Sequence, residues 1–207
     1  QLYAQYQDKE INDDATVAEL SRLFAGKQIM LIGPGTSMQT EREAVKDYIA
    51  EKKPMILSIN YIPEYVDPDY IFLSNSKRYV QLATVLSQKN CLIIATSNVT
   101  CTNGEFDYIL NVSPLLDLNE EIIDNSLIML LKALIRIGIG QVVLAGFDGY
   151  SRDKVNYINE NMEYEFSKRM ADYLNQYTIR FLKENKENIQ VTFLTQSRYA
   201  EGDSYEL

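Results

Sequence analysis

Hydrophobic residues fall into seven short runs along the chain, each about as long as a strand. The runs are rich in Ile, Leu and Val and do not alternate strictly with polar residues, a pattern typical of parallel strands covered on both faces. They are Gln28–Ile32, Met55–Ile59, Tyr70–Leu73, Cys91–Ala95, Tyr108–Val112, Gln141–Ala145 and Val191–Leu194.

Segments with apolar residues at helical spacing lie between these runs. They are Thr40–Glu51, Lys77–Gln88, Glu120–Ile137 and Asn161–Glu184. Strands that alternate with helices indicate right-handed βαβ units. The predicted fold class is therefore α/β, a three-layer, doubly wound, mostly parallel sheet of Rossmann-like type. Such sheets bind ligands at the carboxyl ends of their strands, near the point where the strand order reverses.

The first 26 residues are predicted to be a lead that continues from a missing upstream domain. A helix is expected over Asp14–Phe24, packed on the edge of the sheet, because apolar residues recur there at helical spacing. Residues 27–207 are predicted to form the Rossmann-like nucleotide-binding domain. The chain begins with Gln1 instead of Met, which indicates a piece of a longer protein.

Composition narrows the class of partner. The chain has 207 residues and a net charge of −9, and this acidic balance argues against nucleic acid or an anionic membrane as a partner. No apolar run approaches the roughly 20 residues that span a bilayer. The two cysteines, Cys91 and Cys101, are interpreted as free thiols in a reducing compartment, and the expected location is the cytoplasm.

The chain contains no His. A Ser-His-Asp or Cys-His site and a zinc site built on His are therefore excluded within it. Any chemistry has to use carboxylates, Tyr, Lys or a bound cation. No metal ligands are predicted. Asp148 and Glu165 are the candidates for a carboxylate base.

The main candidate for a binding site is the loop that follows the first predicted strand, from Gly33 through Pro34, Gly35 and Thr36 to Ser37. Glycines let the backbone approach a ligand, and the start of the next helix favours a phosphate. The loop lacks a full dinucleotide fingerprint and the Lys of a P-loop. The alternative is a structural turn in which Thr36 and Gln39 form a capping box. If the loop is exposed, a side chain at Gly35 should cost little stability.

Polar residues also follow other predicted strands. Asn60, Ser74 and Asn75 offer the donors and acceptors that suit a base edge or a ribose hydroxyl, although ordinary turns and caps use the same residues. Asp148 follows a later strand and can hold a cation, orient a hydroxyl or cap a turn. Tyr150 and Tyr157 come next and can donate to a phosphate.

Four motifs make the chain similar to the bacterial CMP-sialic-acid-dependent sialyltransferases. They are Ile-Gly-Pro-Gly-Thr-Ser, Ser-Ile-Asn-Tyr, Pro-Asp-Tyr-Ile-Phe-Leu-Ser-Asn and Val-Leu-Ala-Gly-Phe-Asp-Gly-Tyr. The resemblance implies nucleotide contacts at Gly33, Gly35, Ser37, Asn60, Ser74 and Asn75, and phosphate contacts at Tyr150 and Tyr157. The catalytic His of that family has no counterpart, because the chain reads Phe166-Ser167-Lys168 at that place. This difference implies that the chain binds a nucleotide but does not carry out the transfer reaction of that family.

The whole chain from Tyr3 also resembles the C-terminal part of multidomain proteins with an upstream aldolase-type barrel, relatives of HMG-CoA lyase and 4-hydroxy-2-oxovalerate aldolase. The segment Asp8-Lys-Glu-Ile-Asn-Asp-Asp-Ala-Thr-Val, then Gly26-Lys27 and the glycine loop, carry this resemblance. It implies an aldolase or lyase as the parent protein and a link to surface polysaccharide synthesis. The aldolase site cannot lie in this chain, because such barrels hold their metal partly through His.

The function expected from the sequence is therefore that of an accessory domain of an aldolase. It would bind a nucleotide, a nucleotide-sugar or another phosphorylated ligand at the Gly33–Ser37 loop. Mg²⁺ is a candidate cofactor, and the upstream barrel and a second copy of the chain are candidate partners. Two alternatives stay open: a glycosyltransferase of sialyltransferase-like type, and a domain that only mediates oligomerisation.

Overall fold

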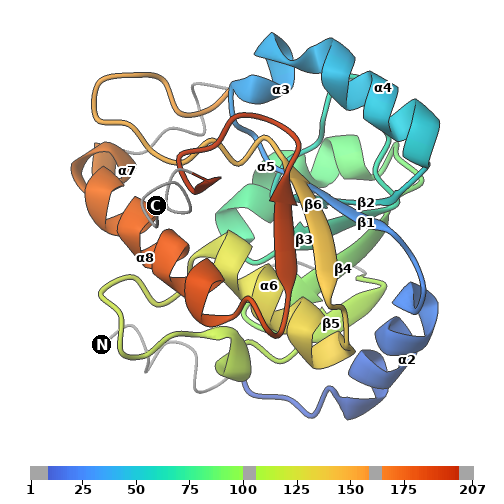
Figure 1. The fold of residues 1–207 in the computed structure, drawn as a ribbon. Coiled ribbons are helices and arrows are strands. Elements are labelled where there is room, and N and C mark those ends of the chain that lie inside the picture. The colour runs from blue at the N-terminus through green and yellow to red at the C-terminus, as the bar shows by residue number, and fades with distance from the viewer. Residues whose placement is uncertain (1–8, 100–105, 159–164, 201–207) are drawn as a thin grey trace. The chain divides into compact units, whose positions relative to one another are not determined.

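A computed structural model of the chain describes residues 9–99, 106–158 and 165–200. In these residues the strands form a parallel sheet with the order β5-β4-β3-β2-β1-β6-β7 (Figure 1). The predicted fold class, a three-layer α/β fold of Rossmann-like type, is confirmed. Within the same ranges, no helix is both long enough and apolar enough to cross a membrane.

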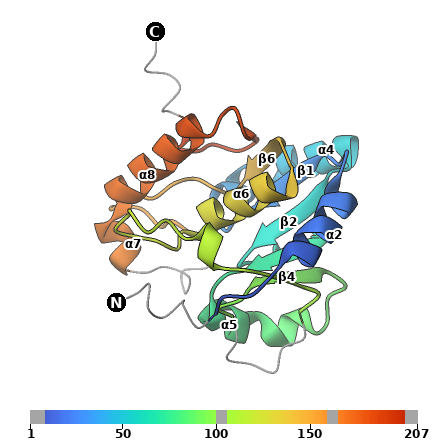
Figure 2. The same ribbon diagram turned by 90° about the horizontal axis from the view of Figure 1, so that it is seen from below.

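Contacts divide the chain into two compact units. Unit 1 comprises Gln1–Lys27 and Ile56–Gly140. Its strands pair in the order β5-β4-β3-β2, and Figure 2 shows helices α5 and α6 on opposite faces of them. Its elements are α2 (Asp14–Phe24), β2 (Met55–Ile59), β3 (Tyr70–Leu73), α5 (Ser76–Leu86), β4 (Leu92–Thr96), β5 (Tyr108–Leu110), the 3-10 helix η1 (Ser113–Leu115) and α6 (Ser126–Ile137).

Unit 2 comprises Gln28–Met55 and Gln141–Leu207. Its strand β6 lies between β1 and β7, with Leu144 opposite both Leu31 and Phe193. Helices α4 and α8 cover opposite faces of these strands (Figure 2). Its elements are β1 (Ile29–Ile32), α3 (Ser37–Thr40), α4 (Arg42–Lys52), β6 (Gln141–Ala145), α7 (Glu165–Arg169), α8 (Ala171–Glu184) and β7 (Gln190–Phe193).

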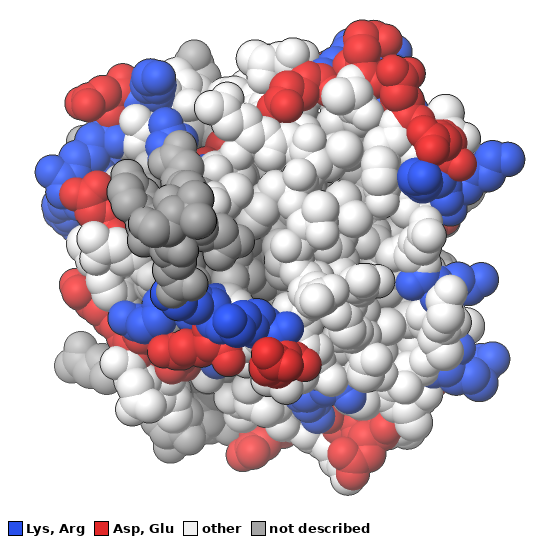
Figure 3. All heavy atoms as spheres, in the orientation of Figure 1, with Lys and Arg blue, Asp and Glu red and all other residues white. Residues whose placement is uncertain are grey.

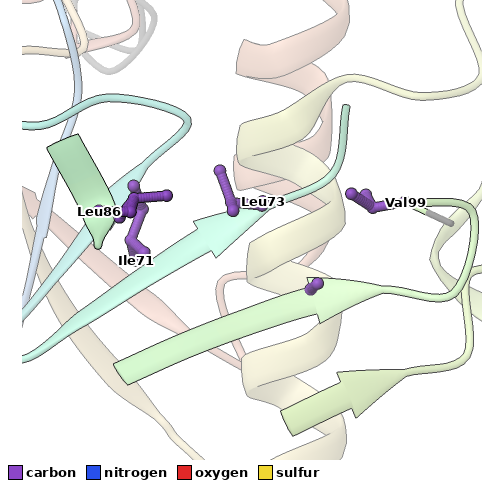
Figure 4. Packing of buried hydrophobic residues seen from close by; sticks show 5 residues of the cluster. Ile71, Leu73, Leu86 and Val99 are labelled. Atoms are coloured by element: carbon purple, nitrogen blue, oxygen red, sulfur yellow. The ribbon is translucent and has the colours of Figure 1, made fainter. Parts of the chain in front are cut away.

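The core of unit 1 forms where α5 packs on β3 and β4. Ile71 and Leu73 from β3 meet Leu86 from α5 and Ala95 from β4, and all four side chains are buried (Figure 4). Helix α6 is apolar on nearly every side, and eight of its twelve residues are buried. A helix with apolar residues all around has to be covered by neighbours, and α2 and η1 contact it.

Most predicted elements are present, and the differences lie at their ends. Helix α6 begins at Ser126 instead of Glu120, because the Asn125 side chain accepts a hydrogen bond from the Ile128 backbone at 3.2 Å and caps the helix there. The long helix predicted over Asn161–Glu184 is broken in its described part, because the backbone leaves helical values at Met170. Helix α2 contacts the edge strand β5, as expected.

An ion pair between a buried carboxylate and an exposed arginine holds the lead of unit 1 in place. The Asp13 side chain accepts hydrogen bonds from Arg136 of α6 through both carboxylate oxygens, each at 3.0 Å, and from the Asn111 backbone at 2.7 Å. Burial alone would raise the pKa of Asp13. The hydrogen bonds from Arg136 and Asn111 and the positive charge of Arg136 outweigh burial, so the pKa is lowered.

Asp13→Asn should destabilise the protein by about 2 kcal/mol at pH 7, because it weakens the hydrogen bonds that the buried carboxylate accepts from Arg136 and Asn111. A lowered pKa means that this contribution is present above the ordinary value of 3.8 and is lost as pH falls through the folded-state value. Urea unfolding of both proteins at pH 7 and pH 3 measures the difference. A matched control is Glu19→Gln, which removes an exposed pair with Arg22 and should change stability by less than about 1 kcal/mol. An equal effect of the two substitutions would contradict the role of Asp13.

Candidate functional site

The strand order reverses between β1 and β6, and both strands belong to unit 2. In open α/β sheets this reversal is where ligands bind, in the space beyond the carboxyl ends of the two strands. Two loops leave those ends. One is the predicted Gly33–Ser37 loop, and the other runs from Gly146 to Tyr150.

The carboxylate of Asp148 joins these two loops. Its Oδ2 accepts a hydrogen bond from the Ser37 backbone at 2.9 Å and another from the Thr36 hydroxyl at 3.1 Å. Its Oδ1 accepts from the Ser37 hydroxyl. Hydrogen bonds to an ionised acceptor are stronger than those between neutral groups. Asp148 therefore orients hydroxyls, which is one of the three roles that the sequence left open.

Thr195, just after β7, extends this connection. Its hydroxyl lies 2.9 Å from the Ser37 hydroxyl and accepts a hydrogen bond from the Gly146 backbone at 2.9 Å. The Gly35 backbone donates to the Gly146 carbonyl at 2.8 Å. The carboxyl ends of β1, β6 and β7 are thus connected through one set of hydrogen bonds, which is buried at Thr195 and partly buried at Asp148.

The glycines of both loops are required by this close approach. A Cβ at Gly33 would lie 2.7 Å from the Gly146 carbonyl oxygen. A Cβ at Gly35 would lie 2.5 Å from the same oxygen and would overlap the Asp148 carboxylate. Gly146 itself has a φ of 79°, in the region that favours glycine. These glycines allow two loops of the protein to meet.

The Gly33–Ser37 loop therefore has a structural role. The predicted capping box is wrong, because Thr36 makes no side-chain cap and donates to Asp148 instead. Helix α3 has only four residues, and the Ser37 N–H at its start already binds a carboxylate of the protein. Binding of an external anion by Gly33, Gly35, Thr36 and Ser37 stays a prediction, and such an anion would compete with Asp148.

Tyr150 and Tyr157 lie together beside these hydrogen bonds, and contact of the pair with a phosphate stays a prediction. Tyr157 donates to the Tyr150 hydroxyl at 3.1 Å, and the rings meet edge to face. The Tyr150 backbone is held at both ends by Asn175 of α8, whose side chain accepts from the Tyr150 N–H and donates to its carbonyl, each at 2.8 Å. Tyr157 forms a backbone bridge with Gly35. Both phenols thus stand on an anchored backbone.

Arg198 and Tyr199 complete the surroundings of this tyrosine pair. Burial, and then the nearby Tyr150, raise the pKa of Tyr199 well above its ordinary value, while a hydrogen bond with Thr178 of α8 acts in the opposite direction. Because its pKa is raised so far, Tyr199 stays protonated at neutral pH. The Arg198 backbone N–H donates to the Asp148 carbonyl at 2.9 Å.

A second polar cluster lies in unit 1, at the carboxyl ends of β2 and β3. The Asn60 side chain donates to the Ser126 hydroxyl at 2.9 Å and to the Ser74 hydroxyl at 3.3 Å, and it accepts from the Ser74 backbone at 3.2 Å. Asn60 has a left-handed φ of 50°, which is uncommon outside glycine. Asn98 donates to the Ser74 carbonyl at 3.0 Å.

The remaining predicted site residues are placed differently. Asn75 caps α5 by accepting from the Arg78 backbone at 3.2 Å. Nucleotide contacts by Asn60, Ser74 and Asn75 stay a prediction. The side chain of Glu165 and the whole of Cys101 lie outside the described residues, and Cys91 is a half-buried free thiol. Among the described residues, no group of three or more Cys, Asp or Glu is arranged to hold a metal ion.

Sequence reasoning missed Asn175, Thr195, Arg198 and Ser126. Asn175 occurs within an amphipathic helix and Ser126 opens another, and neither position carries a local signal of a site. Their roles come from contacts with residues far away in the sequence.

Comparisons with known protein families and with curated proteins found no match. The resemblances to sialyltransferases and to aldolase-linked domains therefore stay expectations.

Gly35→Ala should destabilise the protein by about 3 kcal/mol, because the new methyl group overlaps Asp148 and the Gly146 carbonyl. Gly35 is buried. The condition under which a side chain at this position would cost little stability, an exposed loop, is therefore not met. Thermal and urea unfolding measure the loss. Gly140→Ala is the matched control, because nothing lies within 4 Å of its Cβ, and it should change stability by less than about 0.5 kcal/mol. Similar stability of both variants would contradict the close approach.

Asn60→Gly and Asn60→Ala should both destabilise the protein, because the Ser126 hydroxyl and the Ser74 backbone N–H lose their hydrogen bonds with the Asn60 side chain. The alanine variant should be the less stable of the two by about 1 kcal/mol, since only glycine adopts a left-handed backbone without strain. Urea unfolding of both variants gives the difference. The same two substitutions at exposed Lys53, whose φ is 47°, should show the stability difference that comes from the left-handed backbone alone. Equal stability of the two Asn60 variants would exclude backbone strain at this position.

Proposed function

We propose that this chain is a binding domain that holds a nucleotide or a nucleotide-linked sugar through its phosphate, at the Tyr150–Tyr157 pair of unit 2. It would act as an accessory domain of an aldolase-type parent protein in surface polysaccharide synthesis. Mg²⁺ remains a candidate partner of the phosphate.

The observation that supports this proposal most is the placement of two phenol hydroxyls 3.1 Å apart beside the reversal of strand order. Phenol O–H groups can donate to phosphate oxygens. Asn175 and the Gly35 bridge fix the two backbones before any ligand arrives. Groups that are already ordered lose less conformational entropy on binding.

The hydrogen bonds of the Asp148 carboxylate favour a binding role over transfer chemistry. Both oxygens of this carboxylate accept hydrogen bonds from the Gly33–Ser37 loop. A general base must reach the proton that it removes, and Asp148 would have to leave the loop to do so. The chain also contains no His.

The test is a panel of cytidine, uridine, guanosine and adenosine nucleotides and their sugars, with and without Mg²⁺, measured by thermal unfolding and by calorimetric titration. A ligand at about one hundred times its dissociation constant stabilises the folded state by about 2.7 kcal/mol. Tyr150→Phe and Tyr157→Phe should each weaken binding by roughly tenfold or more, because a hydrogen bond to a charged group is lost.

Tyr48→Phe on helix α4 is the matched control and should leave the dissociation constant unchanged. Each tyrosine variant keeps its ring, so its stability should fall by only about 1 kcal/mol. The proposal is abandoned if no nucleotide stabilises the wild type, or if a bound nucleotide is held equally well by both variants of the pair.

A further inference from the structure

Arg198 lies directly beside the turn that carries Tyr150. A Cβ on Gly149 would lie 2.9 Å from the Arg198 Cβ and 3.5 Å from its Cδ, so the stem of the arginine passes over this glycine. Gly149 has a φ of 82°, which other residues rarely adopt. The turn Asp148-Gly149-Tyr150 therefore leaves room for the arginine side chain.

The backbone around Arg198 is fixed from both sides. The Ser197 hydroxyl donates to the Phe147 carbonyl at 2.6 Å, and the Arg198 N–H donates to the Asp148 carbonyl at 2.9 Å. Tyr199 is buried. The arginine thus extends from a backbone that is tied to the loop of Tyr150, and its guanidinium lies at the Asp148 carbonyl in that loop.

The guanidinium uses few of its donors on the described residues. It offers five N–H groups, and toward that part of the chain it makes one long hydrogen bond, 3.4 Å, from Nη1 to the Asp148 carbonyl. Among the described residues no carboxylate lies within ion-pair distance of it, whereas Arg136 and Arg152 each have one. The chain has 29 acidic and 20 basic side chains, so a half-buried arginine without a carboxylate partner is unexpected here.

A negative group stands close to Tyr150, because the carboxylate of Asp148 belongs to the same loop, two residues earlier. On the face in Figure 3, Lys and Arg lie among Asp and Glu and form no broad basic surface. A phosphate near the tyrosines therefore needs a local positive charge, because the carboxylate would repel it.

We propose that Arg198 supplies this charge and gives the Tyr150–Tyr157 site its preference for phosphate esters and diphosphates over neutral sugars. This inference rests on the proposed function for the location of the site. A planar guanidinium binds two phosphate oxygens at once, so Arg should serve here better than Lys.

Calorimetric titration with inorganic pyrophosphate tests Arg198 without assuming a base or sugar. Arg198→Gln should weaken pyrophosphate binding by about tenfold or more, and Arg198→Lys should retain part of it, because the charge remains and the fork geometry is lost. The affinity of the wild type should fall with added salt, and that of Arg198→Gln should fall less. Arg180→Gln on α8 is the matched control, an exposed arginine of the same unit, and should bind like the wild type.

The outcomes separate this inference from the proposed function. Equal binding of pyrophosphate by wild type and Arg198→Gln overturns the role of Arg198, and the tyrosine variants still decide the nucleotide proposal. Absence of pyrophosphate binding by the wild type also overturns it. Arg198-dependent binding of pyrophosphate, with no nucleotide bound more tightly than pyrophosphate, supports the inference and counts against a nucleotide as the ligand. If Arg198→Gln does not fold, Arg198→Lys against the wild type gives the same comparison.

Discussion

The carboxylate of Asp148 is the constraint on which the rest of unit 2 depends. It receives the donors at the start of α3, and through Ser37 and Thr195 it connects the ends of β1, β6 and β7. Without it, three donors at a partly buried site would lose their partner, which costs more than the net gain of a typical hydrogen bond. The absence of side chains at Gly33 and Gly35 follows from the same contact, because the loops have to meet closely.

The fold could be predicted from the sequence because its determinants are local. Runs such as Met55–Ile59 and Gln141–Ala145 are apolar on consecutive positions and end at polar residues, so even their bounds agree with the structure. The site could be predicted only in part. The Gly33–Ser37 loop has the composition of an anion site, and the anion that it binds is Asp148, 111 residues beyond Ser37. No local pattern distinguishes a carboxylate of the chain from an external phosphate, because both are accepted by the same N–H and O–H groups.

Unit 1 follows the same principle with neutral groups. Asn60, Ser74 and Ser126 come from the ends of two strands and the start of a helix, and they satisfy one another by hydrogen bonds. Buried polar groups need such partners, so hydrogen bonding alone does not identify a ligand site. The left-handed backbone of Asn60 is a separate observation, since strain of this kind persists only where the surroundings enforce it.

A useful criterion for a binding group in this chain is therefore a partly buried charged side chain that has no counterion among the described residues. Asp13 and Arg136 neutralise each other in unit 1, and Asp148 is surrounded by donors in unit 2. Arg198 differs, because its guanidinium meets only a carbonyl in the described residues, in a chain with a net charge of −9. Holding a half-buried cation without a counterion is costly unless an anion joins it. An anionic ligand would offset that cost, and this argument supports the turn of Gly149, more than the glycine loop, as the proposed place for a phosphate.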